Sequence, residues 1–331
     1  MMVIQDASIG IDIGGSATKL GLITKGGELV ASGLVLTPAT MTAKRIMQAI
    51  CAQVDELLKI SRARALNLVG MGISVCGYLE ADGESPDYIN LHALDHYPVV
   101  RHLRERYGLP AVMDNDMNCG VLGEYYFGGG KGERRLMVMT VGTGIGMGMI
   151  IDGKVLRIHA GTVGNPGHII VDADGPICDA GCRGCLESLS AARAISRRAE
   201  DVARAQRETK LTAMLQAKGH LNPRDVFEAA EGGDEAAKEI WTVTGKWLGR
   251  GLASWVEIFG PEVVIVGGGI AQAGHWLLKP LMDEFYRCGE PYFTRRVREI
   301  KKSELGQSIA MLGAASMSLF PENAPRWESG L

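Results

Sequence analysis

The chain has 331 residues, of which 46% are hydrophobic and 22% are charged, and its formal net charge at pH 7 is −3. This length exceeds what one hydrophobic core usually serves, so we expect two domains or two lobes of a duplicated fold. The near-neutral charge, without a basic stripe, argues against a nucleic-acid partner. No apolar run reaches roughly 18 residues and no signal sequence is present, which argues against a membrane partner. These features predict a cytoplasmic protein.

Residues 9–36 read as a β-meander, with an apolar strand, a glycine corner, a second strand, the turn KGG and a third strand. Glycine after a strand lets backbone N–H groups approach a phosphate. The motif DIGGSATK adds hydroxyl donors and a carboxylate that could hold Mg²⁺ directly or through water. The candidate residues of this first corner are Asp12, Gly14, Gly15, Thr18 and Lys19.

The segment after this meander alternates between helical and strand patterns. Residues 42–60 predict a helix that packs on the core through one apolar face, made of Ile46, Ile50, Val54, Leu57 and Leu58. Residues 66–77 predict a buried strand that ends in glycine. The stretch PAVMDNDMNCGVLGEYYFG predicts a strand that runs into a helix through DND, so the alternation indicates α/β layering.

A second glycine-cornered meander begins near residue 136 with LMVMTVGTGIGMGMIIDGKVLRI. Gly14 and Gly142 lie 128 residues apart, and this offset predicts two lobes of similar topology. The candidate phosphate-binding residues of this second corner are Thr140, Gly142, Thr143 and Gly144.

The second half of the chain is rich in helical patterns that stop at Gly260 and Pro261. A buried strand and three glycines follow, and this third corner, Gly267, Gly268 and Gly269, could lie against a nucleoside. The tail from Pro321 reads as an unstructured end. Because GTGIGMG approaches a dinucleotide-binding fingerprint, an NAD-dependent oxidoreductase is an alternative; against it, these glycines lead into a strand and hairpin instead of a helix.

Asp116, in MDNDMNCG, is the candidate catalytic acid-base residue. Phosphoryl transfer to an alcohol needs positioning, charge neutralisation and one carboxylate that accepts the hydroxyl proton. A carboxylate at a strand end beside the amide of Asn115 could supply base catalysis and hydroxyl binding. The alternative is that Asp114 or Asp116 only caps the following helix.

Residues 164–188, GNPGHIIVDADGPICDAGCRGCLES, hold one histidine and three of the seven cysteines. An odd cysteine number without an export signal argues against a disulfide framework and favours metal binding or catalysis. The spacing of Cys182 and Cys185 makes a good chelating pair, while a metal-free loop and a thioredoxin-like thiol pair remain alternatives.

Together these segments resemble the ROK family of sugar kinases and repressors, within the actin, Hsp70 and hexokinase fold, over roughly residues 8–318. DIGGSATK and TVGTGIG resemble the family's two phosphate motifs, NDMNCGVLGE its NDxNxxxxGE, GNPGH its ExGH, CDAGCRGCLE its CxCGxxGCxE and IVGGGIAQAGHWLLKPL its adenosine motif. The resemblance implies a two-lobed, actin-like (ribonuclease H-like) α/β fold. Its lobes would be residues 1–117 with a C-terminal helix at about 313–331, and residues 118–312 with a zinc-loop insertion at 168–187.

The resemblance also implies roles for single residues. Asp116 would be the general base, Asp12 would face Mg²⁺, and the three glycine corners would hold ATP. The sugar pocket would contain Gly77, Asn90, Asn115, Asn165, His168 and Glu187.

The family's cysteine signature and histidine form a structural zinc site, which stabilises a closed loop. His168, Cys178 and Cys185 match family positions, whereas Ala180 stands where the second cysteine belongs. Cys182 would complete a shifted set of four ligands.

Other departures concern the substrate. Asn165 replaces the glutamate of ExGH, and Cys76 and His92 replace prolines in segments that border the sugar. Because asparagine carries both donors and an acceptor and no charge, the pocket should prefer a different hydroxyl pattern.

The sequence therefore predicts a homodimeric, ATP-dependent kinase that phosphorylates a hydroxyl, by family default the 6-OH, of a hexose, amino sugar or related polyol. A non-catalytic sugar-sensing regulator is the first alternative, and polyphosphate is an alternative donor. The first phosphate strand begins by residue 9, without the helix-turn-helix segment of repressor members, which favours the kinase.

Overall fold

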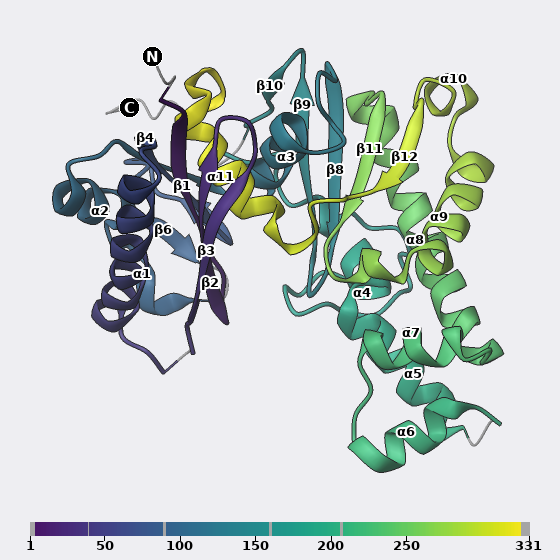
Figure 1. The fold of residues 1–331 in the computed structure, drawn as a ribbon. Coiled ribbons are helices and arrows are strands. Elements are labelled where there is room, and N and C mark those ends of the chain that lie inside the picture. Colours follow the sequence, from purple (N-terminus) through teal and green to yellow (C-terminus); the bar gives the residue numbers. More distant parts are fainter. Residues whose placement is uncertain (1–3, 39, 89–90, 159–160, 206–207, 326–331) are drawn as a thin grey trace. The chain divides into compact units, whose positions relative to one another are not determined.

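The computed structural model describes residues 4–38, 40–88, 91–158, 161–205 and 208–325, and the chain forms two compact units (Figure 1). The first unit comprises Met1–Leu136, Gly148–Gly164 and Glu304–Leu331, and the second comprises Met137–Met147 and Asn165–Ser303. The two predicted lobes, separated at residue 117, stay a prediction.

The first sheet has five strands, in the order β3-β2-β1-β4-β7. They are β1 (Asp6–Ile13), β2 (Ala17–Thr24), β3 (Leu29–Leu36), β4 (Asn67–Val75) and β7 (Ala111–Asn115). The pairs β1–β2 and β2–β3 are antiparallel, while β4 runs parallel to both β1 and β7. The predicted first meander and the two predicted strands after it are confirmed.

Helices cover both faces of this sheet, with α1 on one face and α11 on the other (Figure 1). The helices of this unit are α1 (Ala43–Ala63), α2 (Val99–Tyr107), α3 (Asp116–Phe127) and α11 (Ile309–Leu319). Four of the five residues predicted for the core face of α1 are buried, and Leu58 is partly buried. Two glycines let α11 pack closely: a Cβ on Gly10 would lie 2.1 Å from Met311 O, and one on Gly72 would lie 1.7 Å from Ala314 O.

The second sheet has the order β10-β9-β8-β11-β12. Its strands are β8 (Arg135–Val141), β9 (Ile145–Ile151), β10 (Lys154–Val155), β11 (Val263–Gly267) and β12 (Glu299–Lys302). In both sheets, three consecutive strands are followed across the sheet by two later strands, so the predicted repeat of the topology is confirmed.

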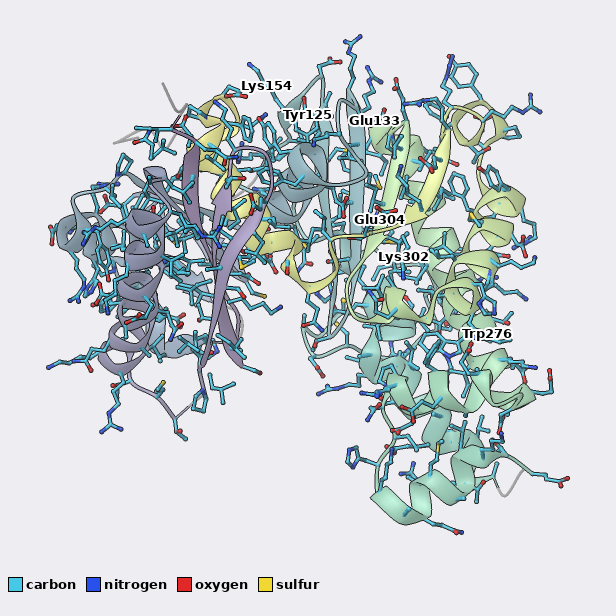
Figure 2. All side chains as sticks on the ribbon, viewed as in Figure 1. Tyr125, Glu133, Lys154, Trp276, Lys302 and Glu304 are labelled. Carbon is cyan, nitrogen blue, oxygen red and sulfur yellow. The ribbon has the colours of Figure 1, made fainter. Side chains whose placement is uncertain are left out.

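The second unit carries most of the helices. They are α4 (Leu186–Ser190), α5 (Ala192–Arg204), α6 (Lys210–Lys218), α7 (Pro223–Glu231), α8 (Glu235–Phe259), α9 (His275–Cys288) and α10 (Pro291–Thr294). Helix α8 ends at Gly260, whose φ of 57° is a left-handed conformation that glycine adopts readily, as the terminator pattern predicts. Trp276 of α9 donates a 2.6 Å hydrogen bond to Glu231 of α7 (Figure 2).

The remaining elements are short. They are the hairpin β5 (Gly77–Leu79) and β6 (Pro86–Tyr88), and the 3-10 helices η1 (His92–Leu94), η2 (Pro166–His168), η3 (Ile270–Ala273), η4 (Gly306–Ser308) and η5 (Pro321–Asn323). Among the described residues, no helix combines the length and apolar character that a membrane crossing requires.

The prediction of an unstructured tail from Pro321 is wrong for residues 321–325. Asn323 is 3% exposed, accepts a hydrogen bond from Val155 N at 3.3 Å and donates to Gly153 O at 3.0 Å. These contacts satisfy a buried amide and fix the segment against the β9–β10 hairpin. Local composition does not reveal them, because Gly153 and Val155 precede Asn323 by more than 160 residues.

Candidate active site

The two candidate carboxylates, Asp12 and Asp116, lie at the carboxyl ends of β1 and β7 in the first unit. Both strands pair with β4. Asp12 is near the end of β1, and its backbone pairs with Ser74 of β4. Ser74 in turn pairs with Asp114 of β7, two residues before Asp116, the first residue of α3. The carboxyl ends of parallel strands meet at one edge of a sheet, which is where ligands bind in open α/β sheets.

Asp12 is half-buried and accepts a 2.9 Å hydrogen bond from the hydroxyl of Ser74. Burial raises the pKa of Asp12, while the Ser74 hydrogen bond and the positive charge of Lys19 act in the opposite direction. The side chain of Ser74 is fully buried, so it holds the Asp12 carboxylate from the interior side of the sheet.

Asp116 has a strongly perturbed carboxyl group. Burial raises its pKa to about 7, and the negative charge of Asp12 adds to this effect. A hydrogen bond from the Cys76 thiol lowers the pKa in part. A carboxyl group that titrates near neutral pH can accept and release a proton at the pH of the cell, which is the property required of a general base.

The carboxyl end of β4 contacts all three polar residues of this corner. Ser74 binds Asp12, Cys76 binds Asp116, and the carbonyl of Gly77 accepts a 2.8 Å hydrogen bond from the amide of Asn115. The segment from Ser74 to Gly77 therefore orients both carboxylates.

Asn115 caps α3. Its side-chain oxygen accepts a 2.9 Å hydrogen bond from Met117 N. The alternative that Asp114 or Asp116 serves as the cap is therefore wrong, because the extended backbone of Asn115 places its side chain at that position. Asn115 is 8% exposed, and its side-chain oxygen and one of its two amide N–H groups are already hydrogen-bonded. Its predicted contact with a sugar hydroxyl would therefore use the other N–H.

The first glycine corner joins β1 to β2. Gly14 and Gly15 are half-buried, and Gly14 N donates to Ala17 O at 3.1 Å. Lys19 is paired across the strands with Asp12, and its ammonium group donates to Gln307 O at 3.0 Å.

Thr18 does not join this corner through its side chain. It is fully buried, and among the described residues its hydroxyl has no hydrogen-bond partner. The alternation of side chains along β2 directs Thr18 to the interior, away from the strand face that carries Lys19.

The second glycine corner joins β8 to β9 and closes with a 2.9 Å hydrogen bond from Gly142 N to Gly144 O. A Cβ on Gly142 would meet no atom within 4 Å, so the backbone there is open to a ligand. Thr143 at its tip is exposed, and Thr140 is half-buried in β8.

Glu187 adjoins this second corner. A Cβ on Gly144 would lie 2.6 Å from Glu187 Oε2, so only glycine leaves room for the carboxylate there. The same oxygen accepts a 3.0 Å hydrogen bond from Ile145 N. The predicted sugar residue Glu187 and the predicted phosphate residue Gly144 are thus neighbours in the second unit.

The third glycine corner follows β11. Gly268 has φ +88°, and a Cβ there would lie 2.3 Å from Val141 O, so glycine is required on conformational and steric grounds. A Cβ on Gly269 would meet nothing within 4 Å, which leaves that backbone accessible. Gly267 is buried as the last residue of the strand.

His168, at the end of η2, lies between the cysteines and Glu187. Its Nδ1 is 3.3 Å from the Sγ of Cys182 and 3.6 Å from the Sγ of Cys178. Its Nε2 is 3.8 Å from Glu187 Oε1. The two predicted roles of His168 therefore fall on different ring nitrogens.

The predicted metal ligands form one cluster. One ligand atom from each of His168, Cys178, Cys182 and Cys185 lies within 4.8 Å of the others. The turn from Cys178 to Cys182 closes through a 2.9 Å hydrogen bond from Cys178 N to Cys182 O, and the two Sγ atoms lie 3.1 Å apart. One imidazole and three thiols are a donor set that suits tetrahedral Zn²⁺.

The other two predicted sugar residues are Asn165 and Asn90. Asn165 is exposed and precedes η2. Asn90 lies outside the described residues.

Ser74 and Arg157 were not predicted as functional residues from the sequence. Ser74 had one visible signal, a hydroxyl residue in an otherwise apolar strand. Arg157 had none, because its partner Asp114 is 43 residues away.

Comparison with known proteins identifies the family. Residues 8–320 match the ROK family. The chain belongs to the ROK family. The glucokinase of Streptomyces coelicolor, a curated ROK relative, is 32% identical over 320 residues, which cover 95% of this chain and 98% of that protein. The N-acetylmannosamine kinase of Escherichia coli is 30% identical over 86% of this chain and 89% of its own.

A solved structure supports the same relationship. The crystal structure of a ROK family glucokinase from Streptomyces griseus, in complex with glucose and AMPPNP, has a TM-score of 0.77 and 32% sequence identity. The match covers 94% of this chain and 98% of that chain. The predicted family and the α/β fold of its sugar kinases are confirmed.

Proposed function

We propose that this ROK protein is an ATP-dependent sugar kinase, a phosphotransferase with an alcohol acceptor. The observation that carries this proposal is Asp116, a carboxylate at the junction of β7 and α3 whose pKa is raised to about 7. Family membership and glucokinase relatives of matching length support it.

In the proposed reaction Asp116 accepts the proton of a sugar hydroxyl while that oxygen attacks the γ-phosphorus of ATP. The bond between the γ-phosphorus and the β,γ-bridging oxygen breaks, and ADP leaves. Base catalysis of this kind contributes about 10²- to 10⁴-fold. The hydrogen bond from Cys76 and the cap at Asn115 hold the Asp116 backbone and carboxylate in place.

We assign the phosphates to the backbone of the first two glycine corners, residues 14–15 and 142–144. At Gly142 a Cβ would meet no atom within 4 Å, so its backbone is accessible. Gly269 offers accessible backbone for the nucleoside. The carboxylate of Asp12, a hard oxygen donor fixed by Ser74, fits a magnesium ligand or a partner of a magnesium-bound water. Bound there, Mg²⁺ would neutralise phosphate charge. We leave the Thr18 hydroxyl out of the nucleotide site because it is buried.

Structural zinc is the second part of the proposal. The cluster of His168, Cys178, Cys182 and Cys185 would hold the zinc ion. The bound metal would fix the loop in the conformation in which His168 faces Glu187. Metal ligation through Nδ1 leaves Nε2–H of the histidine facing the Glu187 carboxylate, an arrangement that commonly orients metal-bound histidines. We propose His168 and Glu187 as groups that hold sugar hydroxyls.

The acceptor is proposed as a hexose, amino sugar or related polyol, with the 6-OH as the family default. Asn165 has no charge where the family motif has glutamate, so a hydroxyl that glutamate would bind as an acceptor meets a group with both donor and acceptor atoms. This difference favours a sugar other than glucose, or a broader set of sugars. The predicted homodimer stays a prediction.

An NAD-dependent oxidoreductase has no support in the fold. The glycines of the second corner lead into strand β9, whereas a dinucleotide fingerprint needs a helix whose N-terminus meets the pyrophosphate. The non-catalytic sugar sensor is distinguished by activity, since a sensor would bind sugar without releasing ADP.

The test is a screen for sugar-dependent ADP release from ATP across hexoses, amino sugars, epimers and cyclitols, with the phosphorylated product identified by mass. The proposal predicts at least one sugar that gives ADP and phosphosugar in equal amounts. ADP release that no sugar stimulates would overturn it, and a parallel series with polyphosphate would identify the donor.

A further inference from the structure

Asp114, the first residue of DND, is a fully buried carboxylate whose oxygens are all engaged. Its Oδ1 accepts hydrogen bonds from Asn115 N at 2.8 Å and from the side-chain amide of Asn118 at 2.7 Å. Its Oδ2 accepts from Nε of Arg157 at 3.0 Å and from Nη2 of the same guanidinium. Two nitrogens of one guanidinium therefore donate to a single carboxylate oxygen, and such charge-assisted hydrogen bonds are stronger than those between neutral groups.

Arg157 reaches this carboxylate from the segment that follows β10. Its Nη2 also donates to the carbonyl of Asn323 at 2.9 Å. Asn323 donates in turn to Tyr126 Oη at 2.8 Å. Figure 2 shows Tyr125 of α3 next to Lys154 of β10, in agreement with the contacts between these two elements. Arg157 thus links β7, the segment after β10 and the residues after α11.

Asn118 of α3 makes a second link between β7 and the residues that follow β10. It is 1% exposed, and its side-chain amide donates to Gly161 O at 2.6 Å as well as to Asp114. Arg157 and Gly161 therefore both contact the β7–α3 corner. In sequence, Asn165 follows Gly161 by four residues.

Burial of an ion pair is weak evidence for a role in stability, because well-packed apolar residues often serve as well or better. Here the pair sits where geometry matters for chemistry. Asp114 fixes the N–H of Asn115, Asn115 caps α3, and Asp116 is the next residue. A displacement of about 1 Å at a reacting group can cost on the order of 10²-fold in rate.

We propose that Arg157 is a positioning residue of the active site, which through its two hydrogen bonds to Oδ2 of Asp114 fixes the β7–α3 corner that carries Asp116. This inference rests on the proposed kinase function. Arg157 touches neither the sugar nor ATP in this role; it acts through Asp114 and Asn115.

The test compares Arg157→Met, Arg157→Lys and the double variant Asp114→Asn/Arg157→Met. The control is Arg134→Met, which breaks a 2.7 Å pair with Asp152 whose side chains are 77% and 55% exposed. Such exposed pairs contribute little, so this control should match the wild type. For each variant kcat, the KM for sugar and for ATP, and the melting temperature are measured on the full chain.

We expect Arg157→Met to lower kcat about 10- to 100-fold with the KM for ATP within about twofold. Lysine retains the charge without the planar fork, so Arg157→Lys should recover part of the melting temperature and little of kcat. The double variant removes both charges, so no unpaired charge stays buried; it should recover the melting temperature while kcat stays low. If Arg157→Met does not fold, kcat of the double variant provides the test.

A double variant that regains wild-type kcat with its melting temperature would make the pair purely structural and overturn the inference. So would an unchanged kcat in Arg157→Met. A wild-type chain that phosphorylates none of the sugars would overturn the proposed function itself, and this inference with it.

Discussion

The hydroxyl of Ser74 donates a 2.9 Å hydrogen bond to the carboxylate of Asp12, from the strand that pairs in parallel with β1. Both residues belong to the first unit and lie near the carboxyl ends of their strands. Because Ser74 is fully buried, its hydroxyl has no competing contact with bulk solvent. The hydrogen bond fixes Oδ1 of Asp12, so the carboxylate is oriented before any cation arrives.

Replacement of Ser74 by alanine should therefore weaken the response to magnesium. Loss of a hydrogen bond to a charged group costs roughly 1.5–3 kcal/mol, which corresponds to about a tenfold or greater rise in the Mg²⁺ concentration for half-maximal activity. The measurement is a Mg²⁺ titration of kcat at saturating ATP and sugar. Ser8→Ala is the control, because the Ser8 hydroxyl is equally buried but donates to a backbone carbonyl, Gly70 O, at 3.0 Å. Equal Mg²⁺ responses in the two variants would exclude a special role for Ser74.

Activity should depend on pH through Asp116. Burial and the charge of Asp12 raise its pKa to about 7, and only the deprotonated carboxylate can accept a proton. We therefore expect kcat/KM for the sugar, at saturating MgATP, to rise with pH and to level off above about 7. The profile is measured between pH 5 and pH 9, with coupling enzymes in excess at each pH. A plateau that persists down to pH 5 would mean that the base has an ordinary aspartate pKa.

The same pKa shift predicts a change in stability. A carboxyl group whose pKa is higher in the folded chain favours the folded state only while protonated. Ionisation of Asp116 should therefore reduce stability progressively as pH rises from about 4, near the ordinary aspartate value, to about 7. Asp116→Asn, which cannot ionise, should melt at a higher temperature than the wild type at pH 8, with a smaller difference at pH 4. A melting temperature at pH 8 below that of the wild type would contradict the cost assigned to the buried charge.

Metal analysis tests the cysteine cluster. The purified chain should contain about one zinc per protomer, and Cys182→Ser should lose most of it. Cys288→Ser is the matched control, because Cys288 is exposed and lies outside the cluster. A Cys182→Ser variant that retains its zinc would show that Cys182 is not a ligand. Zinc-free wild-type protein would contradict the proposed structural zinc site.

Local patterns were enough to predict much of the fold. Both meanders, the core face of α1 and the three glycine corners follow from strand alternation, helical periodicity and glycine placement, all of which act over a few residues. The resemblance to the ROK family then gave the motif residues their expected roles. The cluster of four predicted metal ligands was assigned correctly as a set of neighbours because all of them lie within a single short loop.

Contacts between residues that are far apart in the chain could not be predicted from the sequence. Nothing local shows that Arg157 pairs with Asp114, or that Asn323 anchors residues 321–325. The cap of α3 could not be assigned from the sequence either: three polar residues compete in DND, and backbone geometry selects Asn115. Thr18 shows a similar limit, since a hydroxyl in a glycine-rich motif can still point to the interior when it follows the strand alternation.

Phosphoryl transfer by Asp116→Asn is the decisive measurement for the proposed mechanism. With the best sugar from the screen, we expect this variant to lose at least about 10²-fold in kcat while its sugar dissociation constant stays within about tenfold of the wild type. Asp283→Asn, which changes an exposed carboxylate paired with Lys279, should keep wild-type activity. A fully active Asp116→Asn variant would contradict the assignment of Asp116 as the base and, with it, the proposed mechanism.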